Sequence, residues 1–123
     1  MINRVEHIVL TVSDIERAVS FYERVLNLMP VSSDRSVSAV SCGAQIIYFQ
    51  LLGQEIRHHA LEGSSNIGLC TDWTIEEVRE HLAKESVSIV DESEPSSSFH
   101  SVFINDPDNN LIEIRAYSEM VEE

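Results

Sequence analysis

The chain has 123 residues, of which 43% are hydrophobic and 24% charged, an ordinary composition for a globular protein. Its 21 acidic and 8 basic residues give a formal net charge of -13, which disfavours binding to phosphate backbones and favours cationic ligands. The apolar runs, such as residues 46–49, are too short to span a bilayer, and no signal-like stretch opens the chain. We therefore expect one acidic, cytoplasmic domain that binds neither nucleic acid nor membrane.

Neither the cysteines nor the adjacent histidines predict a metal site. Cys42 and Cys70 form no CxxC pair and are expected to be small buried hydrophobes rather than a disulfide or thiolate zinc site. His58 and His59 are expected to be a surface pair on a loop.

The first half of the chain predicts a strand followed by an amphipathic helix. Positions 5–12 are rich in β-branched residues, and Ser13 with Glu16 forms the pattern of a capping box at a helix start. Apolar residues then recur at helical spacing as far as Leu26. Three further strands are expected near residues 29–33, 36–41 and 45–52.

The second half predicts the same order of elements. A strand at 66–71 precedes a second capping box, formed by Thr74 and Glu77, and a helix whose buried stripe begins at Ile75. The acidic, serine-rich stretch 91–98 is expected to be a loop that borders a site. The remaining expected strands lie near 86–91, 99–105 and 111–117, with a turn at 106–110 before the last one.

The two halves match each other as a repeat at an offset of about 60 residues. His7 corresponds to Asn66, and Gln50 to Glu113. Supersecondary units that each leave an apolar face uncovered tend to pair and share a core. We therefore expect a single domain over residues 1–120, with one module at about 2–55 and the other at about 62–118.

Side-chain alternation sorts the strand residues onto two faces. One face of the first strand is wholly apolar and suits packing against the helix, while the opposite face carries His7. The last strand likewise places Glu113 opposite an apolar face, and if residue 103 pairs with residue 113, His100 points away from that face. The faces with His7 and Glu113 are expected to line a shared pocket. Its other expected lining residues are Val9, Tyr48, Cys70, Ser101, Phe103 and Arg115.

Two segments resemble the opening and closing signatures of the vicinal oxygen chelate superfamily: VEHIVLTVSDIERAVSFYERVLNL at 5–28 and DPDNNLIEI at 106–114. That superfamily includes glyoxalase I, extradiol dioxygenases, and fosfomycin- and bleomycin-resistance proteins, and the likeness covers about residues 2–117. It implies an α+β fold in which paired βαβββ modules form a cupped, barrel-like mixed sheet around a divalent metal. Members often form dimers, some by exchanging modules, so the resemblance also implies a homodimer.

The resemblance implies metal ligands from the first and last strands of each module. His7 matches the family's first-strand histidine and Glu113 its last-strand glutamate. Asn66 stands where a second histidine is common, and Gln50 where some members have a glutamate or histidine. Because two of the four positions offer only amide oxygens, Mn²⁺ or Mg²⁺ suits the set better than Zn²⁺, with Ni²⁺ and Fe²⁺ as further candidates.

Two functions remain open from the sequence. One is a glyoxalase-like, metal-dependent lyase, isomerase or dioxygenase that acts on a small oxygenated molecule, with Glu113 as the catalytic base. Glutathione conjugates need cationic anchors, which are few, and a ring-cleaving iron centre needs a second histidine. The alternative is a non-catalytic small-molecule binding protein of the bleomycin-resistance type, holding a cationic drug or antibiotic. The net charge of -13 and the incomplete ligand set suit this alternative.

Overall fold

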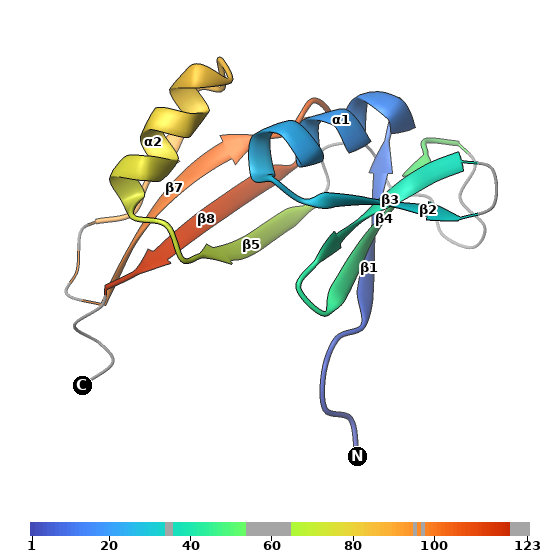
Figure 1. Cartoon of the computed structure of the whole chain (residues 1–123), viewed down its shortest axis with the longest axis horizontal. Coiled ribbons are helices and arrows are strands. Elements are labelled where there is room, and N and C mark those ends of the chain that lie inside the picture. The colour runs from blue at the N-terminus through green and yellow to red at the C-terminus, as the bar shows by residue number, and fades with distance from the viewer. Residues whose placement is uncertain (34–35, 54–64, 95, 97, 119–123) are drawn as a thin grey trace. The chain divides into compact units, whose positions relative to one another are not determined.

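The computed structural model describes residues 1–33, 36–53, 65–94, 96 and 98–118. The chain divides into two compact units, unit 1 (Met1–Ser65 with Pro107–Asn109) and unit 2 (Asn66–Asp106 with Asn110–Glu123). Both units repeat the order of one strand, one helix and three strands (Figure 1). The expected surface pair His58 and His59 lies outside the described residues.

Unit 1 is a four-stranded mixed sheet with one helix. Its elements are β1 (His7–Val12), α1 (Ile15–Leu26), β2 (Met29–Ser33), β3 (Ser36–Cys42) and β4 (Gln45–Leu51). The strand order is β1-β4-β3-β2, and β1 and β4 run parallel while the other pairs are antiparallel. The helix covers one face of this sheet, where the ring of its Tyr22 contacts Phe49 of β4 at 5.0 Å between centroids.

Unit 2 repeats this topology. Its elements are β5 (Asn66–Thr71), α2 (Ile75–Lys84), β6 (Asp91–Glu92), β7 (Phe99–Asn105) and β8 (Leu111–Tyr117). The strand order is β5-β8-β7-β6, with β5 parallel to β8. The predicted α+β fold of two βαβββ modules is therefore confirmed, whereas the cupping of both sheets around one cavity stays a prediction.

Strand alternation separates a buried face from a face without a helix in each unit. In β1, Leu10 and Val12 are at most 2% exposed, whereas Val9, the residue before Leu10, is 47% exposed. In β8, Ile112 and Ile114 are buried and Glu113 between them is only partly covered. We call the faces that carry Val9 and Glu113 the open faces of unit 1 and unit 2.

The two helices start differently from each other. The capping box of α2 is confirmed, because the Glu77 amide donates to Thr74 Oγ1 at 3.1 Å and the Thr74 amide donates to Glu77 Oε1 at 2.9 Å. The capping box expected at Ser13 is wrong. Asp14 caps α1 by accepting from the Arg17 amide at 2.9 Å. The Ser13 hydroxyl instead donates to Oδ1 of the buried Asp108 of the same unit, at 2.6 Å.

Three further expectations are corrected by the structure. No strand fills 86–91: Ser86 adopts a positive φ of 62°, the Val87 amide returns to the Leu82 carbonyl at 2.8 Å, and only Asp91–Glu92 pairs with β7. The expected loop 91–98 thus begins as a strand. Cys70 is exposed rather than buried, because strand alternation places it on the open face of unit 2.

Neither described helix, at 12 and 10 residues, is long enough to cross a membrane.

Replacing Asp14 by alanine tests the assignment of the α1 cap. We expect a loss of about 1 kcal/mol in the free energy of unfolding, since one amide at the helix start loses its acceptor. Urea denaturation followed by circular dichroism measures it. Ser20→Ala, an exposed position within the same helix, is the control and should not destabilise the protein. An equally stable Asp14→Ala protein would contradict this cap.

Candidate functional site

The predicted site residues divide between the two open faces. His7, Val9, Tyr48 and Gln50 belong to unit 1, and the other six belong to unit 2. Those six are Asn66, Cys70, Ser101, Phe103, Glu113 and Arg115. A pocket shared by the two faces stays a prediction, and each face is described by itself.

Glu113 lies at the centre of the open face of unit 2. Its strand, β8, runs between β5 and β7, where Gly68 and Phe103 are its direct partners. The pairing of residue 103 with residue 113, on which the expected orientation of His100 depended, is observed, so His100 lies on the opposite face. The turn before β8 is closed within unit 2 by Asp106, whose carboxylate accepts both the amide and the side-chain nitrogen of Asn110 at 2.9 Å.

One oxygen of the Glu113 carboxylate accepts three hydrogen bonds. The Ser101 hydroxyl donates to Oε2 at 2.6 Å, and Nε and Nη2 of Arg115 donate to the same atom at 3.0 and 2.8 Å. Ser101 is fully buried, so its hydroxyl is fixed in place. The other oxygen, Oε1, receives no hydrogen bond from the described part of the chain. Only a hydrogen atom stands opposite it at Gly68, where an added Cβ would lie 4.0 Å away.

Arg115 is held by aromatic side chains as well as by Glu113. Its guanidinium carbon lies 4.0 Å from the centroid of the Phe99 ring and 5.9 Å from that of Tyr117. A cation over an aromatic ring is attracted by the negative face of the ring. Arg115 thus has a fixed position on the open face rather than a free end in solvent.

These contacts keep the Glu113 carboxyl ionised. The hydrogen bond from Ser101 and the guanidinium of Arg115 hold the pKa of Glu113 below its ordinary value, although burial acts in the opposite direction. Glu113 is therefore an anion with one occupied oxygen and one available oxygen.

The open face of unit 1 carries aromatic and neutral side chains beside His7. The His7 ring meets the Tyr48 ring edge-on, with centroids 5.2 Å apart. Its Nδ1 lies 2.9 Å from the carboxylate of Glu6. Gln50 lies further along β4, where its Nε2 donates to Thr11 Oγ1 at 3.4 Å.

The strand registers correct the correspondence between the two halves. His7 pairs with Ile46, and Asn66 pairs with Leu111. In unit 2, Glu113 lies two positions after Leu111. In unit 1, the residue two positions after Ile46 is Tyr48, so Tyr48 is the counterpart of Glu113. Gln50 is instead the counterpart of Arg115. The register was not visible in the sequence, because the loops between the strands differ in length.

A complete divalent metal centre does not fit these residues. His7 suits one, since a carboxylate on Nδ1 leaves Nε2 for an ion. Glu113 does not, because Arg115 holds one of its oxygens and places a positive charge beside it. Tyr48, the counterpart of Glu113 in unit 1, has an aromatic ring in place of a carboxylate. In the described ranges, no group of three or more His, Cys, Asp or Glu side chains is placed to hold a metal ion.

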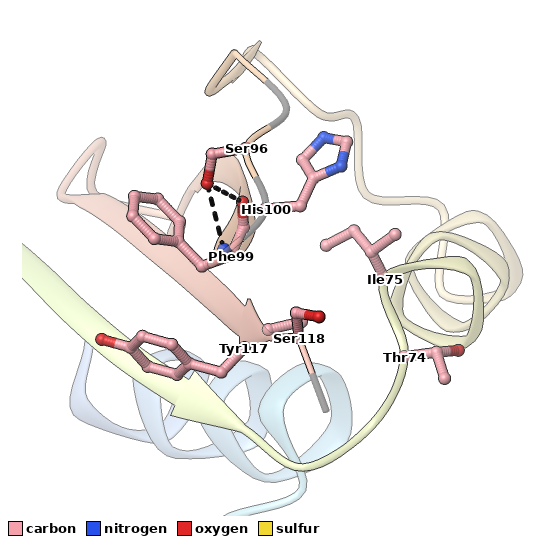
Figure 2. A pocket seen from close by; sticks show the side chains of 8 residues that line it. Thr74, Ile75, Ser96, Phe99, His100, Tyr117 and Ser118 are labelled. Atoms are coloured by element: carbon pink, nitrogen blue, oxygen red, sulfur yellow. Dashed lines mark hydrogen bonds between the residues drawn. The ribbon is translucent and has the colours of Figure 1, made fainter. Parts of the chain in front are cut away.

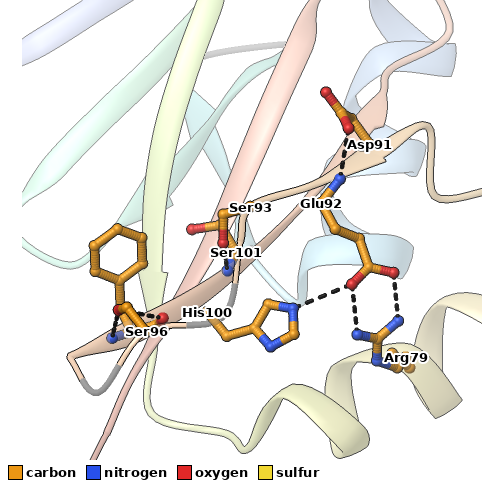
Figure 3. A network of polar contacts seen from close by, with 8 residues as sticks. Arg79, Asp91, Glu92, Ser93, Ser96, His100 and Ser101 are labelled. Atoms are coloured by element: carbon orange, nitrogen blue, oxygen red, sulfur yellow. Dashed lines mark hydrogen bonds and ion pairs between the residues drawn. The ribbon is translucent and has the colours of Figure 1, made fainter.

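An ion network lies on the face of unit 2 opposite its open face, and the sequence did not predict it (Figure 3). Arg79 of α2 donates to both oxygens of Glu92 at 2.8 and 2.7 Å, and Nε2 of His100 lies 3.1 Å from the same carboxylate. Hydrogen bonds from Arg79 and His100 lower the pKa of Glu92 to about 2. The network fastens α2 to β6 and β7, and its polar residues come from segments 13 and 8 positions apart, too far for a local sequence pattern.

A hollow of about 240 Å³ lies at the end of unit 2 where α2 begins (Figure 2). Among the described residues it is bounded by eight: Thr74, Ile75, Ser96, Phe99, His100, Ala116, Tyr117 and Ser118. None of the predicted site residues lines it, but it shares Phe99 and Tyr117 with the surroundings of Arg115. Ser96 is fixed there by hydrogen bonds with the backbone of Phe99.

Removing the Ser101 hydroxyl should raise the pKa of Glu113. Because that pKa is lowered in the folded state, the ionised carboxylate stabilises the fold above the ordinary carboxyl pKa, and the stabilisation is lost as the pH falls through the lowered value. In Ser101→Ala the folded-state pKa is higher, so the stabilisation should be smaller and its loss should be complete at higher pH. Carbon-detected NMR titration of the Glu113 carboxyl measures the shift, with the exposed Ser98→Ala as control. An unchanged titration in Ser101→Ala would refute the assignment.

Comparisons with known proteins agree with the observed topology. A family model described as Glyoxalase/Bleomycin resistance protein/Dioxygenase superfamily matches residues 4–114. Virulence protein STM3117 of Salmonella typhimurium is 34% identical over 124 residues, which cover 95% of this chain and 86% of that protein. Its crystal structure matches with a TM-score of 0.83 at 35% identity, over 95% of this chain and 98% of that one.

Two other solved structures show the same fold. An integron cassette protein from the mobile metagenome of V. cholerae has a TM-score of 0.81 at 32% identity, covering 96% of this chain and 98% of that one. Lactoylglutathione lyase from Agrobacterium tumefaciens has a TM-score of 0.79 at 20% identity, covering 94% and 95%, which is a likeness of fold alone. Since the family model spans most of its length, the chain belongs to the Glyoxalase/Bleomycin resistance protein/Dioxygenase superfamily.

Proposed function

We propose that this protein binds a small, flat, cationic organic molecule on the open face of unit 2, without catalysis and without a resident divalent metal. The observation that carries the proposal is the state of the Glu113 carboxylate. Its Oε2 is held by Ser101 and Arg115, while Oε1 faces Gly68 with no hydrogen-bond donor from the described part of the chain. A ligand N–H group can donate to that oxygen.

The surroundings of Glu113 favour an organic ligand with an apolar body. Phe99 and Phe103 are partly exposed on the same face, and Tyr117 is exposed. Aromatic side chains give a flat ligand a large contact area, and a few polar groups then fix its orientation. The absence of a side chain at Gly68 leaves room beside Oε1.

Charge supports a cationic rather than an anionic ligand. The net charge of the chain is -13, so cations are concentrated near its surface. Arg115 is the cation beside Glu113, and its charge is already balanced by that carboxylate. A metal-dependent lyase, isomerase or dioxygenase, the other function considered, has less support because the Glu113 carboxylate is engaged by Arg115.

A pair of probes with the same shape and opposite charge tests the proposal. Benzamidine is a flat aromatic cation and benzoate is its anionic counterpart. We expect benzamidine to perturb the NMR signals of Glu113 and its neighbours, equally with and without EDTA, and benzoate to perturb them less. Glu113→Gln should weaken benzamidine binding at least about tenfold, since a hydrogen bond to a charged group contributes about 1.5–3 kcal/mol.

A blocking variant supplies the control for position. Gly68→Val places a side chain beside Oε1 in a strand, where valine is well tolerated, so it should abolish benzamidine binding and leave the fold intact. Arg79→Leu, which lies away from the open face, should bind benzamidine like the unmodified protein. Equal binding of benzoate and benzamidine, or binding that needs a divalent ion, would refute the proposal.

We also propose that the protein is a homodimer. On the open face of unit 1, Val9 is 47% and Tyr48 40% exposed, and exposed apolar groups of this size are typical of an interface. Sedimentation velocity at micromolar concentration should give the mass of two chains. A single species of 13.9 kDa would show that the chain is a monomer.

A further inference from the structure

Arg115 is the cation that contacts the Glu113 carboxylate within the described part of the chain. A divalent ion bound to a carboxylate is repelled by a positive charge nearby. Here Arg115 donates two hydrogen bonds to Oε2, at 3.0 and 2.8 Å. The guanidinium is a permanent charge, because arginine is not deprotonated in proteins.

The position of Arg115 is fixed by more than its attraction to Glu113. Its guanidinium carbon lies 4.0 Å from the centre of the Phe99 ring, and Nη1 donates to the Tyr117 hydroxyl at 3.4 Å. Its side chain is 34% exposed and that of Glu113 is 19% exposed, so solvent screens the pair only in part. The side chain is thus arranged in advance to hold the carboxylate.

The repeat shows that this ion pair is particular to unit 2. By strand register, the counterparts of Glu113 and Arg115 are Tyr48 and Gln50. These residues carry a phenol and an amide in place of the charged groups. The backbone arrangement is the same in both units, so the topology does not require a charge pair at these positions. The ion pair therefore depends on the side chains of unit 2 and not on the backbone topology that both units share.

We infer that Arg115 is the resident cation of Glu113 and that it excludes divalent metal ions from this carboxylate. This inference rests on the proposed function, in which the same carboxylate receives an organic ligand. Arg115 selects between ligand classes by charge. A divalent ion at Glu113 must either displace the guanidinium from Oε2 or lie beside its positive charge at Oε1, whereas an organic ligand of lower charge donates a hydrogen bond to Oε1 and leaves the ion pair in place.

Mn²⁺ binding by arginine variants tests the inference. Free Mn²⁺ is counted by electron paramagnetic resonance during titration of the unmodified protein, Arg115→Leu and Arg115→Gln. We expect both variants to bind Mn²⁺ at least about tenfold more tightly than the unmodified protein, because a repelling charge is removed and Oε2 becomes available. Adding Glu113→Gln to either variant should return the affinity to that of the unmodified protein.

Lys84→Gln is the matched control. It removes one positive charge from an exposed position in the same unit and leaves Glu113 untouched, so it should not gain Mn²⁺ affinity. Far-ultraviolet circular dichroism establishes which variants are folded, and Arg115→Gln carries the test if Arg115→Leu is unfolded. Equal Mn²⁺ affinity in the unmodified protein and a folded Arg115 variant, or an equal gain in Lys84→Gln, would overturn the inference. Failure of benzamidine to bind would refute the proposed function without affecting these titrations.

Discussion

The parallel pairing of first and last strands, β1 with β4 and β5 with β8, is the constraint on which the other features of each unit depend. Parallel neighbours need a crossover connection, and the helix in that crossover covers one face of the sheet. A shift of one residue in β8 would move Glu113 onto the buried face and expose Ile112 and Ile114. The hydrophobic core therefore fixes which side chains reach the open face, and the available chemistry is concentrated there.

Local patterns predicted the elements well and failed where distant residues intervene. The two helices were recognised because their apolar stripes and polar faces repeat at helical spacing. Ser13 was mistaken for a cap because the residue that takes its hydroxyl, Asp108, lies 95 positions away in sequence. Strand 86–91 was wrong because the end of α2 uses a left-handed residue at Ser86, a conformation that serine seldom adopts.

The composition of the open faces was predictable, but the contacts within them were not. Alternation placed Glu113 and Arg115 on one face, yet residues two apart in a strand are about 6.6 Å apart, so only a particular choice of rotamers lets them meet. That choice is favoured by Phe99 and Ser101, which come from a neighbouring strand. The relation of Tyr48 to Glu113 also depends on register, which is set by pairing across the sheet rather than by any single segment.

Because of the ion pair, different charges attract a distant ligand and select among ligands that reach Glu113. Glu113 and Arg115 together carry no net charge, so the field that a distant ligand experiences comes from the remaining surface and its charge of -13. That field is screened beyond about 8 Å at physiological ionic strength, so salt acts mainly on the rate of association. Arg115 is felt only when a ligand touches the carboxylate, so it acts on how long the ligand stays. Both classes of cation are attracted toward this surface alike, and the guanidinium distinguishes between them at the last step.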